Sequence, residues 1–392
     1  MPEAIIVSAL RTPIGTAYRG TLTETLPEEM ARIVVSESLF RLGLDPALFD
    51  DIVLAESTYG GGDVARHAAV QTGLTHVPGQ AVNRHCTGSL TAVQVAAGSI
   101  RSGMDELVIA GGVQSASLKP MMRQRVPGTA GSWVEDWTSP SHPDSPEAPN
   151  RDMSITVGWS TAVEAGISRE AMDAWALRSH QRAIAAIDAG SFDAEIVPVQ
   201  ALQKDGSVRD FRVDEHPRRT TSMEKLASLK PVHPEIEGFS ITAGNASGVN
   251  DATAALTVAS DRLVRAEGLQ PLATVRAWAN VGVEPRRMGM SVIDVVPKVL
   301  DRAGLTIKDI ALWEINEAFA SVPIAACRAL GIDEERVNTR GSGCSLGHPV
   351  AASGARMLTT LVHQLHATGG GLAVAAMCAG GGQGGAMVIE VA

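Results

Sequence analysis

A pairing of one helix with one strand occurs twice in this sequence, and that repetition constrains the fold more than any other feature. In the first copy Cys86 precedes a small-residue helical segment, which is followed by the strand ELVIAGG. In the second copy His348 begins the segment HPVAASGARMLTTLVHQL, in which Pro349 opens the helix, and the strand LAVAAM and a glycine run follow. Two related halves therefore predict that Cys86 and His348 lie at comparable helix N-termini.

The residues around the first copy alternate between strand and helix patterns. Residues 4 to 8 (AIIVS) and 51 to 55 (DIVLA) are apolar runs that predict buried strands, and residues 26 to 43 predict an amphipathic helix between them. After Thr87, apolar residues recur at helical spacing while small residues occupy the other faces, so this helix can pack on several sides. The alternation predicts βαβ units and a layered α/β fold with this helix at its centre.

Composition and charge exclude several classes of protein. The chain has 392 residues and a formal net charge of −10, whereas binding along a nucleic acid needs an excess of basic groups. No uncharged apolar run reaches the roughly 18 residues of a membrane-spanning helix. The N-terminus lacks the basic start and long apolar core of a secretion signal. We therefore expect a soluble protein that binds neither nucleic acid nor membrane.

The cysteines and histidines predict no metal site. The 4 cysteines lie far apart and none forms a CxxC pair, which argues against a zinc knuckle and against a disulfide framework. The histidines other than His348 lie mostly in polar segments and form no evident metal-binding triad. Free thiols suit a reducing compartment, so we expect a cytoplasmic protein without a bound metal.

The region between the two copies differs from them in composition. Residues 119 to 150 hold many Pro, Ser and Asp residues and few periodic apolar positions, which predicts an ordered surface excursion or lid. Residues 168 to 190 predict a strong helix that Ser168 caps. Arg218 and Arg219 belong to a basic group in an otherwise acidic protein, where they either bind an anionic ligand or form a solvated surface patch.

Cys86 and His348 each stand where a helix is predicted to begin. Unpaired N–H groups and the positive end of the helix dipole would favour the thiolate of Cys86, which is the nucleophilic form. At His348 the same end of a dipole disfavours a second proton, so we expect a neutral imidazole near pH 7 that acts as a base or hydrogen-bond donor. The alternatives are a small buried cysteine that fills space and a histidine that only caps its helix.

Two further groups could take part in the same chemistry. Cys378 ends a strand before a glycine run that leaves room for a ligand and supplies unhindered N–H donors, although it could also be an inert core residue. Asn316, in the segment NEAFA after the apolar stretch ALWEI, offers an amide at a strand end, although asparagine often caps helices.

Several segments taken together resemble the thiolases. NRHCTGSLTAV, ITAGNASGVNDA, WEINEAFA, GSGCSLGHPVAASGAR and CAGGGQGGAMVIE occur in the order and positions of that family's motifs, and RTPIG resembles its opening motif. The resemblance covers essentially the whole chain. It implies a thiolase-like duplicated αβαβα layered fold with an inserted loop domain. The implied parts are an N-terminal half at 1–118 and about 248–268, a loop domain that contacts CoA at 119–247, and a C-terminal half at 269–392.

The resemblance also implies a role for each reactive residue. Cys86 matches the nucleophile that becomes acylated, His348 the base that activates it, and Cys378 the thiol that exchanges protons with substrate. Asn316 matches the amide that holds an oxyanion-hole water. Gly380 matches the backbone donor that binds the thioester oxygen together with the N–H of Cys86. For CoA, Ser247 and the preceding TAGNA match the segment that grips pantetheine, and the candidate contacts are Ser247, Ala243, Met153, Arg218, Arg219 and Met288.

The implied function is that of an acyl-CoA thiolase. Such an enzyme cleaves a 3-oxoacyl-CoA with CoA to acetyl-CoA and a shortened acyl-CoA, or condenses two acetyl-CoA, through an acyl-Cys86 intermediate. CoA is a substrate here, and no cofactor is implied. The resemblance further implies a place in fatty acid metabolism and a homodimer or homotetramer.

Three other functions remain to be compared with this one. A ketoacyl-synthase-like condensing enzyme of the same fold would generally pair its cysteine with His-His or His-Asn, and Cys378 argues against it. A non-catalytic acyl-CoA-binding subunit would have lost some of the reactive positions, all of which are present. A cysteine hydrolase would release the acyl group to water without CoA.

Some positions depart from the family pattern. Asp152 stands where biosynthetic members carry a histidine near pantetheine, and Gly158 stands where glutamate is usual. Gln114 and Ala116 replace the usual glutamate and methionine before the segment that commonly makes dimer contacts. We therefore take neither an acyl chain length nor a direction of reaction from the resemblance.

Overall fold

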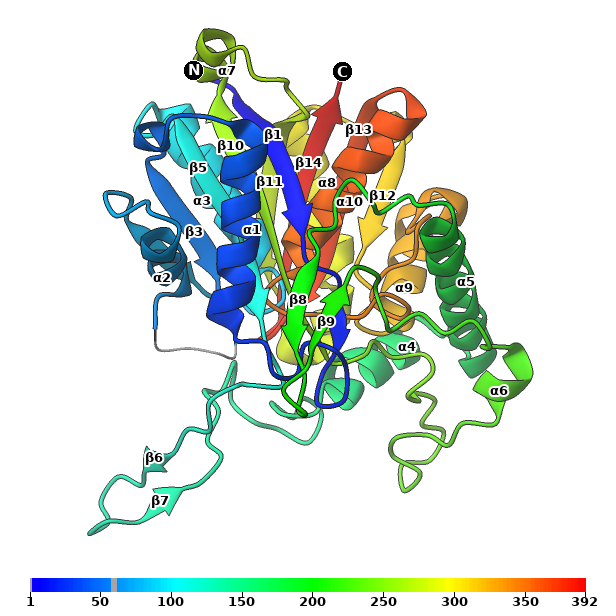
Figure 1. Ribbon diagram of the computed structural model, residues 1–392. Coiled ribbons are helices and arrows are strands. Elements are labelled where there is room, and N and C mark those ends of the chain that lie inside the picture. The colour runs from blue at the N-terminus through cyan, green and yellow to red at the C-terminus, as the bar shows by residue number, and fades with distance from the viewer. Residues whose placement is uncertain (1, 58–61) are drawn as a thin grey trace.

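A continuous mixed sheet joins the two halves of the molecule. The computed structural model describes residues 2–57 and 62–392, and its main sheet has the strand order β12-β13-β14-β11-β1-β10-β5-β3-β4, with β2 (Gly15–Thr16) paired to β10. β1 and β11 meet antiparallel where the halves join, with Ile5 opposite Thr274. Figure 1 shows the strands running side by side through the centre of the protein.

The N-terminal half contains strands from both ends of its sequence. Its strands are β1 (Ala4–Arg11), β3 (Asp51–Ala55), β4 (Gly79–Val82), β5 (Leu107–Gln114) and β10 (Asn250–Ser260). Its helices are α1 (Pro27–Leu42), α2 (Val64–Gln71), α3 (Gly88–Ser102) and α7 (Asp261–Glu267), with a short 3₁₀ turn η1 (Pro46–Leu48). The predicted strands at 4 to 8 and 51 to 55, and the predicted helix between them, are confirmed.

The C-terminal half repeats the arrangement. Its strands are β11 (Ala273–Gly282), β12 (Leu312–Ile315), β13 (Gly371–Ala379) and β14 (Gln383–Val391). Its helices are α8 (Ser291–Ala303), α9 (Ser321–Leu330) and α10 (Ser353–Thr368), with 3₁₀ segments η3 (Pro285–Met290), η4 (Ile307–Asp309) and η5 (Glu334–Arg336). α3 leads into β5, which lies parallel to β3, and α10 leads into β13, which lies parallel to β12. The predicted duplicated layered α/β fold is confirmed.

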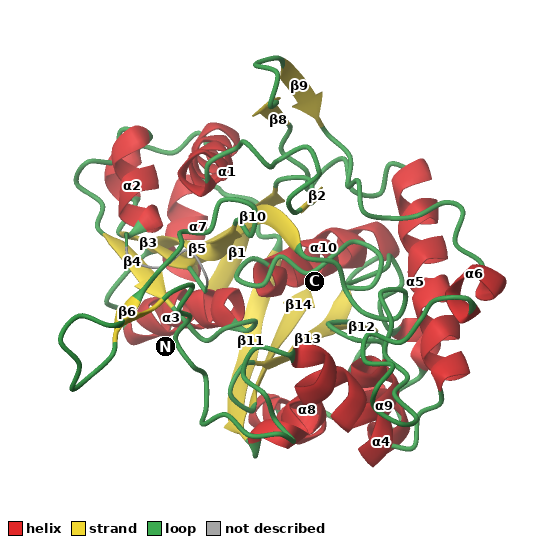
Figure 2. Ribbon diagram, turned by 90° about the horizontal axis from the view of Figure 1, so that it is seen from below, coloured by secondary structure: helices red, strands yellow, loops and turns green. Residues whose placement is uncertain are grey.

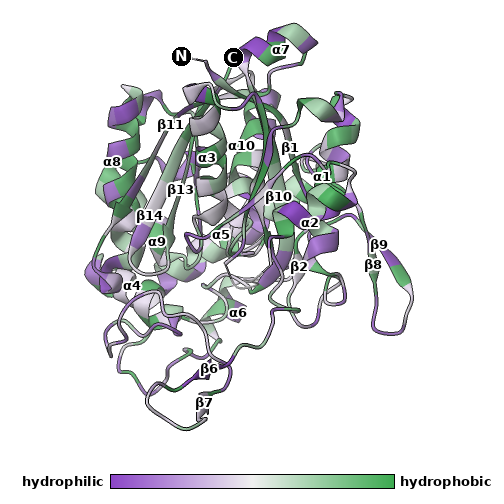
Figure 3. Ribbon diagram, turned by 90° about the vertical axis from the view of Figure 1, so that its left-hand side faces the viewer, coloured by the Kyte–Doolittle hydropathy of each residue, from purple (hydrophilic) through white to green (hydrophobic). Residues whose placement is uncertain are grey.

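The three largest of the four apolar cores among the described residues separate the layers. The middle core combines side chains of α3 and α10 with the facing sides of both half-sheets, including Leu90, Val93 and Leu358. α3 and α10 approach closely, because a Cβ at Gly354 would lie 2.7 Å from Leu90 Cγ. A second core lies under α1 and α2, and a third lies between the C-terminal half-sheet, α8 and α9. Figure 2 shows this layering, and in Figure 3 the hydrophilic colour lies mainly on the outer helices and loops.

The inserted region supplies several short elements and one long helix around one end of the sheet. They are β6 (Gln124–Arg125), β7 (Trp133–Val134), the π-helix η2 (Ser154–Trp159), α4 (Ser160–Glu164), α5 (Arg169–Asp188), β8 (Val199–Leu202), β9 (Val208–Phe211) and α6 (Met223–Ala227). Ser168 caps α5 as predicted, because its hydroxyl accepts a hydrogen bond from Ala171 N. β6 and β7 project from the body as expected for a surface excursion (Figure 1), whereas His142 and Ala148 are buried. The three-part domain division stays a prediction.

The helix of the second repeat begins later than predicted. α10 begins at Ser353, and Pro349 lies in the preceding turn, where its carbonyl accepts hydrogen bonds from Ala352 N and Ser353 N, both at 2.9 Å. His348 forms a bridge with Val249, which keeps the chain extended before this turn. His348 therefore lies about one turn before the helix, whereas the sequence placed it directly before the first helical residue, Pro349. None of the helices among the described residues is long and apolar enough to cross a membrane.

Candidate active site

Cys86 lies in a tight turn immediately before α3. The preceding residue, His85, has a left-handed backbone with φ of 46°, and Gly88 N donates to the His85 carbonyl at 2.9 Å. A non-glycine residue in that conformation costs about 1 to 3 kcal/mol, and such residues cluster at functional sites. Cys86 itself is half-buried at the edge of the middle core. The turn thus presents a single thiol at the boundary between the two repeated helices.

Burial governs the protonation of Cys86. It raises the pKa of the Cys86 thiol to about 11, although the backbone N–H groups of Gly380 and of Cys86 itself favour the thiolate. The backbone N–H groups therefore favour the thiolate as expected, but burial outweighs them in the free protein. The helix dipole acts within the first turn, and Cys86 precedes the first helical residue by two positions. At pH 7 Cys86 is a neutral thiol that needs a base.

Cys378 and Gly380, at the end of β13, approach Cys86 from the other half. Burial raises the pKa of the Cys378 thiol, and a thiolate at Cys86 would raise it further, so the two sulfurs share one environment. The N–H of Gly380 interacts with the Cys86 sulfur. A Cβ at Gly380 would lie only 2.9 Å from the ring carbon Cγ of His85. Glycine at 380 therefore lets the backbone approach the turn that carries Cys86.

His348 is a buried imidazole with a defined orientation. Its backbone N donates to Asn250 Oδ1 at 3.0 Å, and its Nδ1 lies 2.6 Å from Ser353 Oγ. The Ser353 hydroxyl donates its proton to the Pro349 carbonyl at 2.9 Å, so it accepts a hydrogen bond from Nδ1–H. This pairing leaves Nε2 of His348 as the ring nitrogen that can accept a proton.

The imidazole of His348 is neutral at pH 7, as predicted, but mainly for a different reason. Burial lowers the pKa of His348 to about 4, and the positive charge of Arg356 lowers it further. Arg356 is itself buried and pairs with Glu314 at 3.0 Å, so a cation close to the ring is part of the core. Protonated His348 would therefore be strongly destabilised until a negative charge forms beside it.

Asn316 faces His348 from the end of β12. Its Nδ2 lies 3.4 Å from each ring nitrogen of His348, and its backbone N donates to the Ala376 carbonyl at 3.0 Å. Asn316 is fully buried, yet its Oδ1 has no hydrogen-bond partner among the described residues. Leaving a buried acceptor unpaired costs about 1 to 3 kcal/mol, so a ligand or solvent group that donates to Oδ1 is favoured.

Glu317, which the sequence interpretation treated only as a neighbour of Asn316, is a buried carboxylate with four donors. Its Oε1 accepts from Trp175 Nε1 and Asn338 Nδ2, both at 2.8 Å. Its Oε2 accepts from Ser179 Oγ at 2.6 Å and from Cys344 N at 3.1 Å. The carboxylate therefore fastens the chain just after Asn316 to α5. Glu317, Ser353 and Asn250 were missed, although all three lie within the segments that resemble family motifs.

The predicted pantetheine segment lies beside the residues that follow Asn316. Ser247 N donates to the Ala318 carbonyl at 2.9 Å, and Ala246 forms a bridge with Phe319. Ala243, in the same segment, is exposed and Ser247 is partly exposed, so both can contact a ligand. The structure thus brings this segment next to the candidate catalytic residues.

The other candidate CoA contacts lie in different surroundings. Met153 is partly buried at the start of η2, whereas Met288 is 1% exposed within the core of the C-terminal half. Arg219 forms a bidentate ion pair with Asp188, and Arg218 is exposed beside His216 in a polar pocket of about 320 Å³. Contact of these side chains with CoA stays a prediction.

Three of the residues that depart from the family pattern contact other side chains or backbone groups in this structure. Asp152 pairs with His233, whose Nε2 lies 2.7 Å from Asp152 Oδ2. Gly158 lies against Phe319, since a Cβ there would come within 2.7 Å of the phenyl ring. Gln114 Oε1 accepts hydrogen bonds from Ser57 Oγ at 3.0 Å and from Ala351 N at 3.2 Å, so it joins β5 to the turn before α10.

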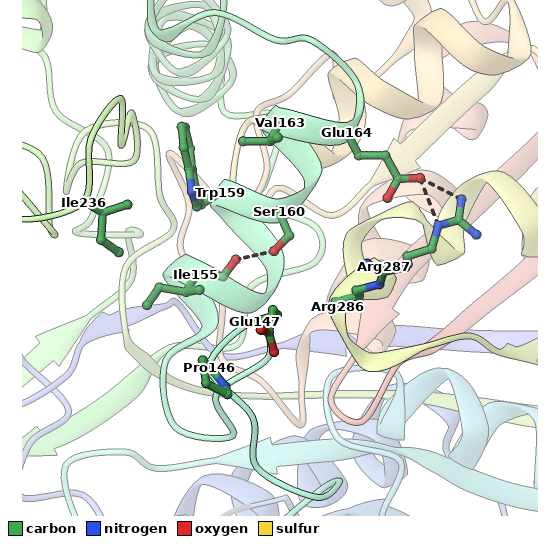
Figure 4. Close-up of a pocket in the computed structure, with 10 residues that line it drawn as sticks. All are labelled: Pro146, Glu147, Ile155, Trp159, Ser160, Val163, Glu164, Ile236, Arg286 and Arg287. Atoms are coloured by element: carbon green, nitrogen blue, oxygen red, sulfur yellow. Dashed lines mark hydrogen bonds and ion pairs between the residues drawn. The ribbon is translucent and has the colours of Figure 1, made fainter.

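A pocket of about 660 Å³ lies outside the group formed by Cys86, His348, Cys378 and Asn316, none of which lines it. Its walls come from η2, α4, η3 and the end of the excursion, and Figure 4 shows Trp159, Ile155 and Val163 on one helical surface with Arg287 across from them. Within residues 2–57 and 62–392, no group of three or more His, Cys, Asp or Glu side chains could hold a metal ion.

Comparisons with known proteins agree on one family. The model of the thiolase N-terminal domain matches residues 4–262, and the model of the thiolase C-terminal domain matches residues 269–391. The 3-oxoadipyl-CoA/3-oxo-5,6-dehydrosuberyl-CoA thiolase of Escherichia coli is 39% identical to this chain over 402 residues, with 100% of both chains covered.

Solved structures show the same similarity in three dimensions. The acetyl-CoA acetyltransferase of Bacillus anthracis has a TM-score of 0.90 and 35% identity, covering 100% of this chain and 99% of its own. Human mitochondrial 3-ketoacyl-CoA thiolase in complex with CoA has a TM-score of 0.90 and 32% identity, covering 100% of this chain and 98% of its own. The resemblance stated from the sequence motifs is confirmed.

Proposed function

The chain belongs to the thiolase family, and from that premise we propose how its own residues carry out the reaction. The protein is an acyltransferase that catalyses thiolytic cleavage of a 3-oxoacyl-CoA with CoA, and the reverse condensation. The residues to which we assign roles are Cys86, His348, Cys378, Asn316 and Gly380. CoA serves as a substrate, and no other cofactor is invoked.

The first step is removal of the Cys86 proton by Nε2 of His348. A thiol with a pKa of about 11 is ionised at pH 7 in roughly one molecule in ten thousand, so free thiolate costs about 5 kcal/mol. Transfer to a histidine whose pKa is about 4 is also unfavourable in the free protein. We therefore place the transfer together with attack on the substrate, when the negative charge moves from the sulfur to the carbonyl oxygen.

Cleavage then passes the electron pair of the C2–C3 bond to the thioester half. The Cys86 sulfur bonds to C3 of the 3-oxoacyl-CoA, and collapse of the tetrahedral adduct breaks the C2–C3 bond to leave an acetyl-CoA enolate. The thiol of Cys378 donates its proton to C2, which releases acetyl-CoA. The thiol of a second CoA attacks the acyl-Cys86 thioester after losing its proton to Cys378, which is a thiolate once it has protonated C2. Shortened acyl-CoA leaves, and the Cys86 thiolate regains its proton from His348.

Two sets of donors stabilise the negative oxygens of these steps. The N–H groups of Cys86 and Gly380 converge near the Cys86 sulfur, where an acyl-Cys86 carbonyl would form. His348 and Asn316, 3.4 Å apart, lie together on the C-terminal half and would hold the other oxygen, directly or through a water molecule. One such donor contributes about 3 to 4 kcal/mol in the transition state.

The observation that carries the proposal is the shared environment of Cys86 and Cys378, two thiols from different repeats with Gly380 N–H beside them. The test is CoA-dependent cleavage of acetoacetyl-CoA, with Cys86→Ser as the variant. Cys327→Ala is the matched control, because Cys327 is a buried free thiol on α9 outside the site. We expect two acetyl-CoA per cleavage, loss of turnover in Cys86→Ser and activity in the control. Hydrolysis without CoA, or full activity in Cys86→Ser, would contradict the proposal.

Assembly, location and pathway belong to the same proposal. We propose a homodimer or homotetramer in a reducing cytoplasm, supported by the family relationship and by the free state of all four cysteines. A role in fatty acid metabolism is supported by the name of the human relative, a 3-ketoacyl-CoA thiolase. Light scattering of the purified protein checks the assembly directly.

A further inference from the structure

A buried ion pair of Glu314 and Arg356 lies close to the catalytic base. Arg356 Nη1 donates to Glu314 Oε2 at 3.0 Å, and both side chains are 1% exposed. Ser342 completes a triangle, because its hydroxyl accepts from Arg356 Nη2 at 3.0 Å and donates to Glu314 Oε2 at 3.2 Å. The pair joins β12, which carries Glu314, to α10, which carries Arg356, and Figure 1 shows these two elements side by side.

Strand and helix geometry place this pair beside His348 and Asn316. Glu314 and Asn316 are two residues apart along an extended chain, so their side chains lie on one face. Ser353 and Arg356 are three residues apart on α10, so they also share a face. Ser353 Oγ lies 2.6 Å from His348 Nδ1, and Asn316 Nδ2 lies 3.4 Å from the same nitrogen. The ion pair is therefore the next layer of polar groups after those that contact the imidazole.

Hydrogen bonding within the pair is incomplete, so stability alone does not account for it. Arg356 Nε and Glu314 Oε1 are buried and have no hydrogen-bond partner among the described residues. Unpaired buried polar atoms lower stability, and a buried ion pair often stabilises a fold no more than apolar side chains of the same size. A role in the reaction would explain why two charged residues occupy this part of the core.

The two charges of the pair affect the protonation of His348 in opposite directions. Burial lowers the pKa of His348, and the positive charge of Arg356 lowers it further. The Glu314 carboxylate offsets that positive charge at ion-pair distance. Two further charged side chains are coupled to Glu314, namely Glu317 and Arg340.

We propose that Glu314 is a positioning residue for the catalytic base, because it holds Arg356 and offsets its charge while His348 takes the proton of Cys86. The proton moves from Sγ of Cys86 to Nε2 of His348, and Glu314 keeps its own charge throughout. With Glu314 ionised, the imidazolium forms beside a pair that is neutral as a whole. Without that carboxylate, the imidazolium and the Arg356 guanidinium would repel one another in a core where water screens little. The inference rests on the proposed thiolase function and adds a residue to it.

Three variants of the full chain separate charge compensation from structural support. Glu314→Gln keeps the shape of the side chain and leaves the charge of Arg356 uncompensated. Glu314→Gln combined with Arg356→Met, the double variant, removes both charges. Glu195→Gln is the matched control, because Glu195 is also buried in an ion pair, with Arg11 at 2.6 Å, and Asp214 still pairs with Arg11 in that variant.

Two rates are measured at neutral pH for each variant that remains folded by circular dichroism. The first is kcat for thiolysis of acetoacetyl-CoA, with KM from the same assay. The second is the rate at which iodoacetamide alkylates Cys86, followed by mass spectrometry, which needs the thiolate but neither CoA nor turnover. Failure of the wild-type protein to cleave acetoacetyl-CoA would refute the proposed function, whereas the alkylation rates would still test the role of Glu314.

We expect Glu314→Gln to lower both rates by about tenfold or more, because one pKa unit in the base corresponds to a factor of about ten, and to leave KM within about threefold. The double variant is expected to recover most of the lost rate, and Glu195→Gln to keep the wild-type rates. Wild-type rates in Glu314→Gln, a further fall in the double variant, or an equal loss in Glu195→Gln would overturn the role.

The double variant decides the question if Glu314→Gln does not fold, because it leaves no unpaired charge in the core. Rates within about threefold of wild type in the double variant would then support the role of Glu314, and a loss of about tenfold or more would overturn it.

Discussion

Replacing Glu317 by glutamine would test whether this buried carboxylate holds the catalytic amide in place. Glu317 accepts four hydrogen bonds, from Trp175, Asn338, Ser179 and the backbone N of Cys344. A carboxamide keeps the shape but replaces one acceptor oxygen by an NH₂ group. With NH₂ at the position of Oε1, two side-chain N–H donors would face it.

The opposite orientation costs less and sets the expected magnitude. With NH₂ at the position of Oε2, the Ser179 hydroxyl can rotate to accept, so only the Cys344 N–H loses its acceptor. One unpaired buried N–H costs about 1 to 3 kcal/mol, and the remaining hydrogen bonds lose their charge assistance. Relief of the buried charge offsets part of this loss. We expect Glu317→Gln to lower the free energy of unfolding by about 2 to 4 kcal/mol.

The same substitution is expected to slow catalysis through Asn316. The chain that Glu317 anchors carries Asn316, and a displacement of about 1 Å in a positioned group can cost up to 100-fold in rate. Urea unfolding gives the stability, and steady-state thiolysis of acetoacetyl-CoA gives kcat. Glu335→Gln is the control, because Glu335 is 74% exposed and its ion pairs with Arg178 and Arg182 are worth about 1 kcal/mol or less. A Glu317→Gln protein with wild-type stability and wild-type kcat would refute this reasoning.

Three further predictions concern the reacting groups and their pH dependence. In Gly380→Ala the new Cβ would displace the His85 ring, so we expect kcat to fall about 10- to 1,000-fold. Gly98→Ala is the control and should retain activity, because a Cβ there would have no atom nearer than 4.0 Å. A Gly380→Ala protein with wild-type kcat would contradict the close approach of Gly380 to His85. Cys378→Ala should still become acetylated at Cys86 but should not exchange the α-protons of acetyl-CoA in D₂O; wild-type exchange rates in this variant would remove Cys378 from its role. His348, His180 and His216 have pKa values lowered to about 4, mainly by burial, so their protonation favours the unfolded chain and stability should fall as pH drops from about 6.5 toward 4. Between pH 6.5 and 5 each contributes about 2 kcal/mol to that loss, measurable by urea unfolding, and equal stability at the two pH values would contradict the assignment.

Local sequence patterns predicted the elements whose buried residues follow a regular spacing or form one apolar run. The strand at residues 51 to 55 is a short apolar run, and β3 has those bounds because the whole run packs into the sheet. The helix after Thr87 was placed correctly because its apolar and small residues segregate by face. The helix–strand pair that occurs twice could be predicted from the sequence for the same reason.

Local sequence patterns did not predict the features that depend on tertiary contacts. Pro349 suits the first position of a helix, yet α10 begins at Ser353 because His348 is held in an extended bridge with Val249, far away in the sequence. The raised pKa of Cys86 depends on packing that brings both halves together, and the neighbouring backbone N–H groups do not outweigh that desolvation. The groups that donate hydrogen bonds to Glu317 come from α5, far before it in the sequence, and from segments that follow it. No local sequence pattern therefore predicts that they meet at this carboxylate.

The most direct test of the central claim is to identify the residue that carries the acyl group. The protein is mixed with acetyl-CoA, quenched in acid, digested and analysed by mass spectrometry, alongside Cys86→Ser and the Cys327→Ala control. The account predicts one acetyl group on the peptide that contains Cys86, present in the control and absent from Cys86→Ser. An acetyl group on Cys378 instead, or labelling that survives unchanged in Cys86→Ser, would contradict it.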